Sequence, residues 1–149
     1  MRAVVQRVRR AAVRVDGLMI GQIDLGLLVY VGAGRGDGPL DAKALAEKVA
    51  FLRVFPDGRL PLNRSVLDVG GAVLVVSQFT LLGDCRRGRR PSFSDALDPA
   101  EAESLIATFT RELQGRGAST MTGRFGAMMD VESLNWGPVT ILLDSKKVF

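Results

Sequence analysis

The chain contains no histidine, and this absence excludes more chemistry than any other feature of its composition. Without an imidazole, the Ser-His and Cys-His pairs of nucleophilic enzymes cannot form, and the commonest general base at neutral pH is missing. Cys85 is the only cysteine, so it can form no internal disulfide, and one cysteine cannot supply the usual ligands of a zinc site. We therefore expect no metal and no cofactor, and the cysteine usage favours an intracellular, cytoplasmic location.

Long apolar runs are missing too, although 47% of the 149 residues are apolar. The segment from Leu18 to Val31 is interrupted by Gln22 and Asp24, whereas a membrane span needs roughly 18 apolar residues. Length and composition are those of one globular domain over residues 1–149. The arginine-rich start could be a transit peptide. Because it continues directly into a strand-and-turn pattern, we interpret it as the first strand instead.

The positive charge is carried mainly by arginine, which accounts for sixteen of the twenty basic residues in a chain of net charge +4. Arginine is suited to bidentate phosphate contacts and to stacking on bases. Four arginines lie in Arg86-Arg87-Gly88-Arg89-Arg90, and four more lie between Arg7 and Arg14. Each cluster alone is compatible with a solvated surface, but together they equally indicate a polyanionic partner such as nucleic acid.

Hydrophobic periodicity predicts more strands than helices. The strands are expected over residues 4–15, 18–23, 27–31, 72–79, 127–134 and 139–143. Asp16-Gly17 has the composition of a hairpin turn, and Asp41 and Asp98 are candidate N-caps of the two main helices. The pattern predicts an α+β fold in which two main helices pack on a curved, mostly antiparallel sheet or open barrel.

Two segments are candidates for a reaction site. Ser77-Gln78-Phe79-Thr80 stands at the end of the most apolar strand, where polar residues are either satisfied structural groups or site residues. Ser77 and Thr80 could be nucleophiles, but neither has a base nearby in the sequence. Asn135-Trp136-Gly137-Pro138 precedes a buried strand, and its Gly-Pro step is either an ordinary turn or a rigid backbone device with a cis bond. Phe125 and Met129 are either core residues or the soft wall of a pocket.

In this order and spacing, the segments resemble the D-aminoacyl-tRNA deacylases, a family of small intracellular hydrolases. The resemblance covers residues 1–144 and rests on Met1-Arg2-Ala3-Val4-Val5-Gln6-Arg7-Val8, Asn63-Arg64-Ser65-Val66-Leu67-Asp68-Val69-Gly70-Gly71, Ser77-Gln78-Phe79-Thr80-Leu81, Arg89-Arg90-Pro91-Ser92-Phe93, Thr122-Gly123-Arg124-Phe125-Gly126-Ala127 and Gly137-Pro138-Val139-Thr140. The chain departs from the family pattern at Trp136, where an aspartate is expected.

The resemblance implies a homodimer that hydrolyses the ester of D-aminoacyl-tRNA, and glycyl-tRNA would not be excluded. Gly137 and Pro138 would form a cis step that reaches into the partner's pocket and rejects L-aminoacyl groups. Ser77, Gln78, Phe79 and Thr80 would line the reaction centre, with Phe125 and Met129 contacting the substrate. The ribose 2′-hydroxyl and backbone donors would carry the chemistry, with Thr80 as nucleophile the alternative. Two other classes stay open: an RNA-binding module, which explains only the arginines, and a small-molecule esterase, which explains only a pocket.

Overall fold

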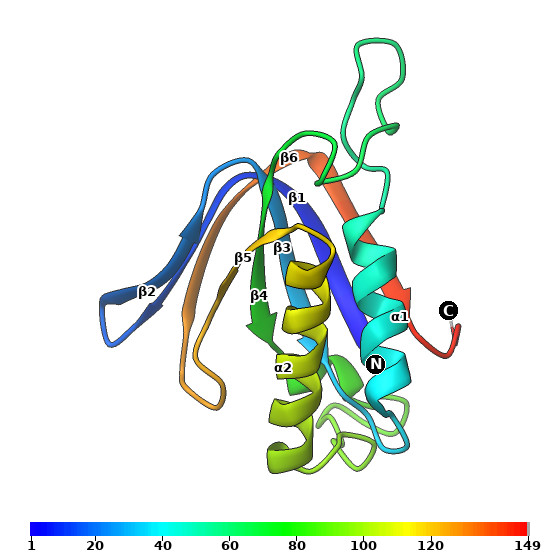
Figure 1. Ribbon diagram of the computed structural model, residues 1–149. Helices are drawn as coiled ribbons and strands as arrows, with labels where there is room; N and C mark the ends of the chain where they lie inside the picture. The colour runs from blue at the N-terminus through cyan, green and yellow to red at the C-terminus, as the bar shows by residue number, and fades with distance from the viewer. Residues whose placement is uncertain (149) are drawn as a thin grey trace.

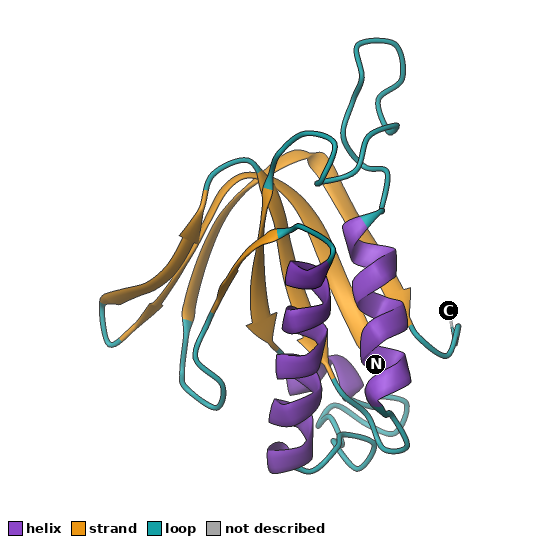
Figure 2. Ribbon diagram, in the orientation of Figure 1, coloured by secondary structure: helices purple, strands orange, loops and turns teal. Residues whose placement is uncertain are grey.

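The computed structural model describes residues 1–148 as a sheet with two long helices on one of its faces (Figures 1 and 2). In chain order the elements are β1 (Arg2–Val15), β2 (Leu18–Ile23), β3 (Gly26–Gly32), α1 (Pro39–Ala50), β4 (Ala72–Ser77), the 3₁₀ helix η1 (Phe79–Leu82), α2 (Pro99–Gly115), β5 (Ser119–Thr122) and β6 (Asp130–Asp144).

The sheet is curved and mixed, with strand order β2-β1-β3-β4-β5 and with β6 paired to β1. Strand β1 is antiparallel to β2, β3 and β6, whereas β3, β4 and β5 run parallel to one another. The parallel pairs follow from the helices, because α1 connects β3 to β4, α2 connects β4 to β5, and such crossovers return the chain in the same direction. The predicted curved sheet with two main helices is confirmed, and three of its five strand pairs are antiparallel.

Apolar residues fill both faces of the sheet. On the helix side, Val29 of β3 packs in one buried cluster with Leu45 of α1 and Phe109 of α2. On the concave side, Leu28 of β3 and Leu74 of β4 belong to a second cluster enclosed by the curvature of the strands. Because β3 is covered on both faces, its sequence is continuously apolar instead of alternating.

Several predicted boundaries need correction. Helix α1 begins at Pro39 with Gly38 as its N-cap, and the predicted cap Asp41 lies inside the first turn, where its carboxylate accepts a hydrogen bond from the Gly38 amide at 2.9 Å. The strand predicted over residues 72–79 ends at Ser77, and the chain then enters η1. The two strands predicted over residues 127–134 and 139–143 are one strand, β6, and the short polar strand β5 was not predicted.

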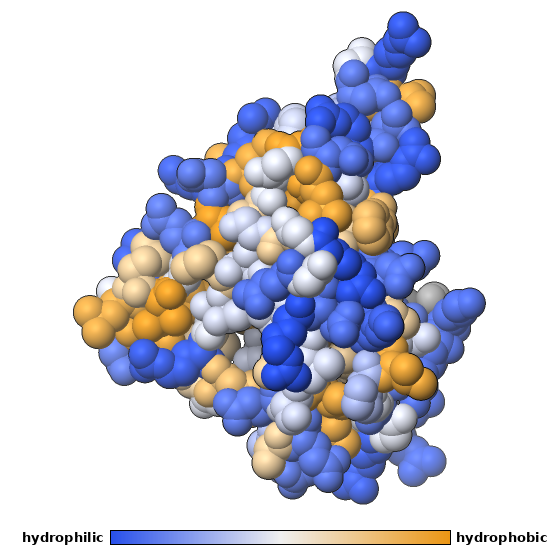
Figure 3. All heavy atoms as spheres, viewed as in Figure 1, coloured by the Kyte–Doolittle hydropathy of each residue, from blue (hydrophilic) through white to orange (hydrophobic). Residues whose placement is uncertain are grey.

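The β1–β2 hairpin extends away from the helices, and the turn at Asp16-Gly17 is confirmed by positive φ values of 50° and 78°. Figure 3 shows apolar side chains at the free end of this hairpin, where Leu18 is 68% and Met19 is 41% exposed. Among residues 1–148, neither helix combines the length and apolar character that crossing a membrane requires.

Candidate active site

A cavity of about 1090 Å³ lies at one end of the sheet. It lies between the segment that follows β4, the start of α2 and the segment over residues 125–131. Six of the eight predicted site residues line it: Ser77, Gln78, Phe79, Thr80, Phe125 and Met129. The structure therefore brings the Ser77–Thr80 segment and the Phe125–Met129 segment together, as a site requires.

The Ser77–Thr80 segment is held where the parallel pairing of β3 and β4 ends. The Gln78 amide donates to the Val31 carbonyl at 2.8 Å, and the next residues turn into η1. Phe79 is 58% exposed, and its ring meets the edge of Phe93 with the centroids 4.9 Å apart. The four predicted residues thus stand at the mouth of the cavity, with polar groups and an aromatic ring presented to it.

Among residues 1–148, the Thr80 hydroxyl has an amide as its hydrogen-bond partner and bonds to no carboxylate. The Gln78 side-chain amide donates a short hydrogen bond to Thr80 Oγ1. The ionisable residues that line the cavity are Arg35, Asp98 and Glu101. Asp98 is engaged as the N-cap of α2, where its carboxylate accepts from the Ala100 amide at 3.1 Å. Within residues 1–148, no recorded hydrogen bond joins a carboxylate to Ser77 or Thr80, so neither hydroxyl has a partner that would remove its proton.

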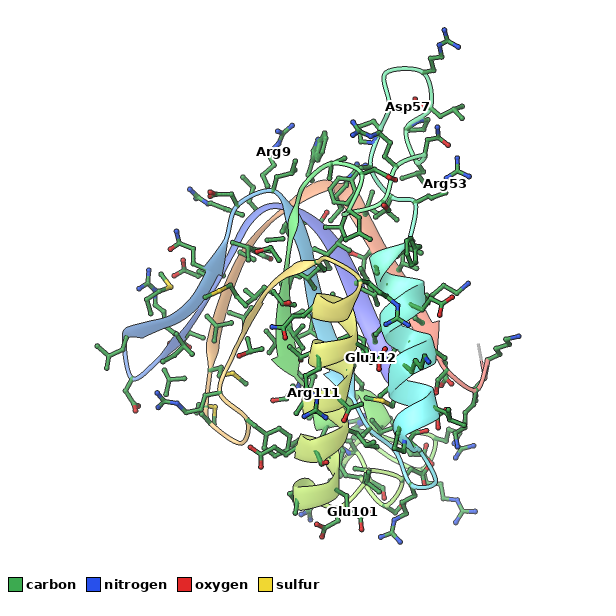
Figure 4. All side chains as sticks on the ribbon, viewed as in Figure 1. Arg9, Arg53, Asp57, Glu101, Arg111 and Glu112 are labelled. Carbon is green, nitrogen blue, oxygen red and sulfur yellow. The ribbon has the colours of Figure 1, made fainter. Side chains whose placement is uncertain are left out.

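The second predicted motif lies at the other end of the sheet. Gly137-Pro138 has a cis peptide bond, as predicted, and both residues are exposed. The step forms an irregularity in β6, because Thr140 pairs with Gln6 and Asn135 pairs with Val8. In Figure 4, Arg9 beside this motif and Glu101 at the cavity lie at opposite ends of the molecule. One chain therefore does not bring the two predicted motifs into one cavity.

Arg7 holds the backbone just before the Gly137-Pro138 step. Its side chain is buried, and the guanidinium donates through Nε to the Trp136 carbonyl at 2.7 Å and through Nη1 to the Val54 carbonyl at 2.6 Å. Burial lowers the pKa of Arg7, and the neighbouring charge of Arg9 lowers it further. Both guanidinium groups lie 4.4 Å from the centre of the Trp136 ring.

Asn135 and Gly137 complete this backbone arrangement. The Asn135 side chain accepts from the Val139 amide at 2.8 Å and donates to the Val139 carbonyl at 3.2 Å, which spans the step. Gly137 has a φ of +145°, and a Cβ added there would lie 2.8 Å from Cγ2 of Val139. Glycine is therefore required at this position, and the step is fixed from both sides.

Sequence reasoning missed the second wall of the cavity and the residues that hold the Gly-Pro step. Arg35, Phe93, Asp98 and Glu101 line the cavity but stand in loops or at a helix start, where no local pattern marked them as residues of a cavity. Arg7 was named only within an arginine cluster and within the opening motif, with no role of its own. The available signal was its position, because a charged residue among alternating apolar residues of a strand must find buried partners. In the described part of the chain, no three His, Cys, Asp or Glu side chains are grouped as metal ligands would be.

Known proteins match this chain over almost its whole length. The sequence model of the family described as D-Tyr-tRNA(Tyr) deacylase matches residues 4–144. A protein of Fervidobacterium nodosum named D-aminoacyl-tRNA deacylase is 54% identical over 149 residues, covering 100% of both chains. A protein of the same name from Roseiflexus castenholzii is 59% identical, covering 97% of this chain and 92% of its own length.

Two solved structures have the same fold. One, titled c-Myc DNA Unwinding Element Binding Protein, is 38% identical with a TM-score of 0.89, covering 97% of this chain and 98% of its own. The other, titled as a probable eukaryotic D-amino acid tRNA deacylase, has a TM-score of 0.80 at 16% identity, covering 96% of this chain and 98% of its own, and shares the fold alone.

Proposed function

The chain belongs to the D-Tyr-tRNA(Tyr) deacylase family, and we propose that it hydrolyses the ester that joins a D-amino acid to the 3′-terminal adenosine of tRNA. The products are the free D-amino acid and tRNA. The observation that carries this proposal is the family match over residues 4–144, because every residue that lines the cavity lies within it. Membership places the chain among hydrolases that act on ester bonds.

The cavity suits an aminoacyl-adenosine in size and chemistry. Its volume of about 1090 Å³ lies slightly above the roughly 300–1,000 Å³ of ordinary ligand sites. Phe125 and Met129 supply an apolar wall against which the adenine can pack, and Ser77 and Gln78 supply polar groups for the ribose and the ester. We assign these six lining residues, from Ser77 to Thr80 together with Phe125 and Met129, to substrate binding and to the reaction centre.

The backbone at the start of η1 is the best candidate for an oxyanion hole. The Gln78 amide is already bonded to Val31, but the first N–H groups of a helix have no partner within it, which leaves those of Phe79 and Thr80 for a ligand. When water adds to the ester carbonyl, the carbonyl oxygen becomes negatively charged, and preorganised N–H donors stabilise that charge. The bond to the ribose 3′-oxygen then breaks, and that oxygen takes up the proton that the attacking water loses.

The ribose 2′-hydroxyl is the group best placed to move this proton, because it is on the carbon next to the 3′-oxygen in every aminoacyl-tRNA. The protein offers no imidazole, and in the described part of the chain the Thr80 hydroxyl accepts from Gln78 and bonds to no base. A threonine nucleophile needs such a base. Thr80→Ala should therefore retain deacylation, whereas a 2′-deoxy terminal adenosine should abolish it. A trapped acyl-Thr80 intermediate would reverse the assignment.

Rejection of L-aminoacyl groups is assigned to Gly137 and Pro138. Their backbone carbonyls can accept from the α-amino group, and a filter made of backbone reads handedness without selecting a side chain. The α-carbon and the ester carbonyl are adjacent atoms, whereas in one chain the Gly-Pro step and Ser77 lie at opposite ends of the sheet. Leu27 of β3 pairs with Arg7, which holds the Gly-Pro step, and Val31 of β3 pairs with Ser77. From Leu27 to Val31 the strand spans about 13 Å, at about 3.3 Å per residue. The Gly-Pro step must therefore come from a second copy, so we propose a homodimer with a site at each interface.

The filter rejects an L-aminoacyl group because its side chain would clash with the protein. Glycine has no side chain to clash, so glycyl-tRNA is a further expected substrate. The first experiment measures initial rates on D-aminoacyl-, L-aminoacyl- and glycyl-tRNA and on a free D-amino acid ester. We expect turnover of the D-aminoacyl- and glycyl-tRNAs alone. Equal rates on the D and L substrates would refute the filter. Turnover of the free ester alone would indicate a small-molecule esterase, and tRNA binding without turnover would indicate an RNA-binding module.

Mixed dimers test the two-chain site. Thr80→Trp fills the cavity from an exposed position, and Gly137→Ala disturbs the step at the other end. Each variant alone should fail to hydrolyse D-aminoacyl-tRNA with normal selectivity. A dimer with one subunit of each kind contains one open cavity facing one intact Gly-Pro step, so selective activity should return on mixing. If both motifs served one subunit, mixing would restore nothing.

A further inference from the structure

The arginine-rich loop over residues 85–91 is a surface that the proposed reaction does not use. Its neck is closed by two backbone hydrogen bonds between Asp84 and Ser92, at 2.8 and 2.9 Å, and all seven residues of the loop are exposed. Phe93, which follows the neck directly, lines the cavity. In Figure 1 the loops of this part of the chain lie beside η1 and the start of α2, at the cavity end of the molecule.

One arginine of the loop is already neutralised within the protein. Arg86 donates to Asp84 through Nε at 2.8 Å and through Nη2 at 2.7 Å, and its backbone amide donates to the same carboxylate at 2.9 Å. These bonds hold the pKa of Asp84 at about 2, well below its ordinary value. Arg86 and Asp84 thus shape the neck of the loop and contribute no net charge.

The other three arginines point their charge to solvent. Arg87, Arg89 and Arg90 are exposed, and within residues 1–148 no ion pair is recorded for any of them. Four other arginines of the chain do form such pairs: Arg2, Arg14, Arg86 and Arg116. Three like charges within four residues repel one another, and they are stabilised by a partner that carries closely spaced negative charges.

The position of the loop identifies the partner. The nucleotides that precede a terminal adenosine in the cavity must leave through the cavity mouth, and the exposed ring of Phe79 and that of Phe93, next to the loop, both line the cavity. Resting on the proposed function, we propose that Arg87, Arg89 and Arg90 bind the backbone phosphates of the tRNA acceptor arm directly upstream of the terminal adenosine. Guanidinium groups bind phosphate oxygens in a bidentate manner, and such contacts add affinity without reading the sequence. The loop would therefore hold any tRNA, whichever amino acid it carries.

The test compares a long and a short substrate. The variant Arg87→Gln/Arg89→Gln/Arg90→Gln is assayed on D-aminoacyl-tRNA and on the same D-amino acid esterified to adenosine, which has no upstream phosphates. Losing three phosphate contacts should lower kcat/KM on the tRNA by about 100-fold at 0.1 M salt. The rate on the adenosine ester should not change. The slope of log Kd for deacylated tRNA against log salt should fall by about 2.

The control variant Lys43→Gln/Lys48→Gln/Arg111→Gln removes the same charge from the outer faces of α1 and α2. In Figure 4, Arg111 lies well along α2 from Glu101, and Glu101 marks the start of that helix, near which the arginine-rich loop lies. This control variant should bind tRNA with nearly the affinity of the wild type. An equal loss in the control would mean that only net charge matters, and an equal loss on both substrates would mean that the loop supports the site's shape.

Either result overturns the proposal, as would a loop variant that binds tRNA like the wild type. A loop variant with normal tRNA affinity but altered association with an acidic protein would assign the loop to that other class of partner. Because deacylated tRNA binding is measured without turnover, the test remains decisive even if the wild type hydrolyses neither substrate, a result that would refute the proposed function itself.

Discussion

Replacing Arg7 by methionine should destabilise the protein, although methionine keeps most of the apolar stem. The guanidinium makes two strong hydrogen bonds to carbonyls, at 2.7 and 2.6 Å, and a longer one to the Pro61 carbonyl at 3.4 Å. A hydrogen bond from a charged donor contributes about 1.5–3 kcal/mol. Two such bonds at the lower end give a loss of about 3 kcal/mol, since relief of the burial cost of the charge offsets the rest.

The measurement is the free energy of unfolding in urea at one fixed protein concentration, because the proposed dimer would unfold in a concentration-dependent way. Arg7→Lys is the matched control. It keeps the charge but replaces the planar fork by a single ammonium, so it should recover about half of the loss. A loss below about 1 kcal/mol for Arg7→Met would refute the assignment of Arg7 as the clamp of this end of the sheet. Full recovery by lysine would show that charge alone, without the fork, is sufficient.

Three further predictions test local features. Backbone hydrogen bonds from Leu60 and Arg59 lower the pKa of Asp57 from 3.8 to about 2. The stabilising contribution of this carboxylate should therefore be present above about pH 4 and lost as the pH falls through 2, so that wild type and Asp57→Asn converge in acid urea denaturation. Gly26→Ala should prevent the pairing of β3 with β4, because the new Cβ would lie 1.8 Å from a carbonyl oxygen of β4, whereas Gly115→Ala, with open space around it, should raise the thermal midpoint. Exhaustive chelation should leave the deacylation rate unchanged, since the described chain offers no cluster of metal ligands, and a rate restored by added zinc would contradict this.

The first three strands could be predicted accurately from the sequence. Residues 18–23 form β2 within the predicted limits, and β1 extends only two residues beyond its predicted start. Alternation of buried and exposed residues along β1 provides this signal, because side chains of a strand point to opposite faces in turn. Strand β5 has the sequence Ser-Thr-Met-Thr and mostly exposed side chains, so no apolar pattern marked it.

The predicted element boundaries were wrong where a residue type suits two structural positions. Asp41 is typical of an N-cap, but a proline two residues earlier occupies the first turn, and the carboxylate serves the helix start from the third position. Phe79 and Thr80 are good strand residues by propensity, yet they form η1. Their displacement from the strand creates the exposed segment at the cavity mouth, so the propensity rule fails at the residues assigned to the reaction centre.

The composition of the site depends on the direction of β4, which local patterns do not give. Because β3 and β4 are parallel, with Val31 opposite Ser77, the loops that follow both strands meet at one edge of the sheet. Arg35 therefore reaches the same cavity as Thr80. In an antiparallel pair, the end of one strand faces the start of the other, and Arg35 would lie at the far edge from Ser77. The missing signal was present in the sequence as the helix between the two strands, because a crossover that contains a helix returns the chain in parallel. Applied to residues 33–71, that rule predicts the shared edge, and with it the second wall of the cavity.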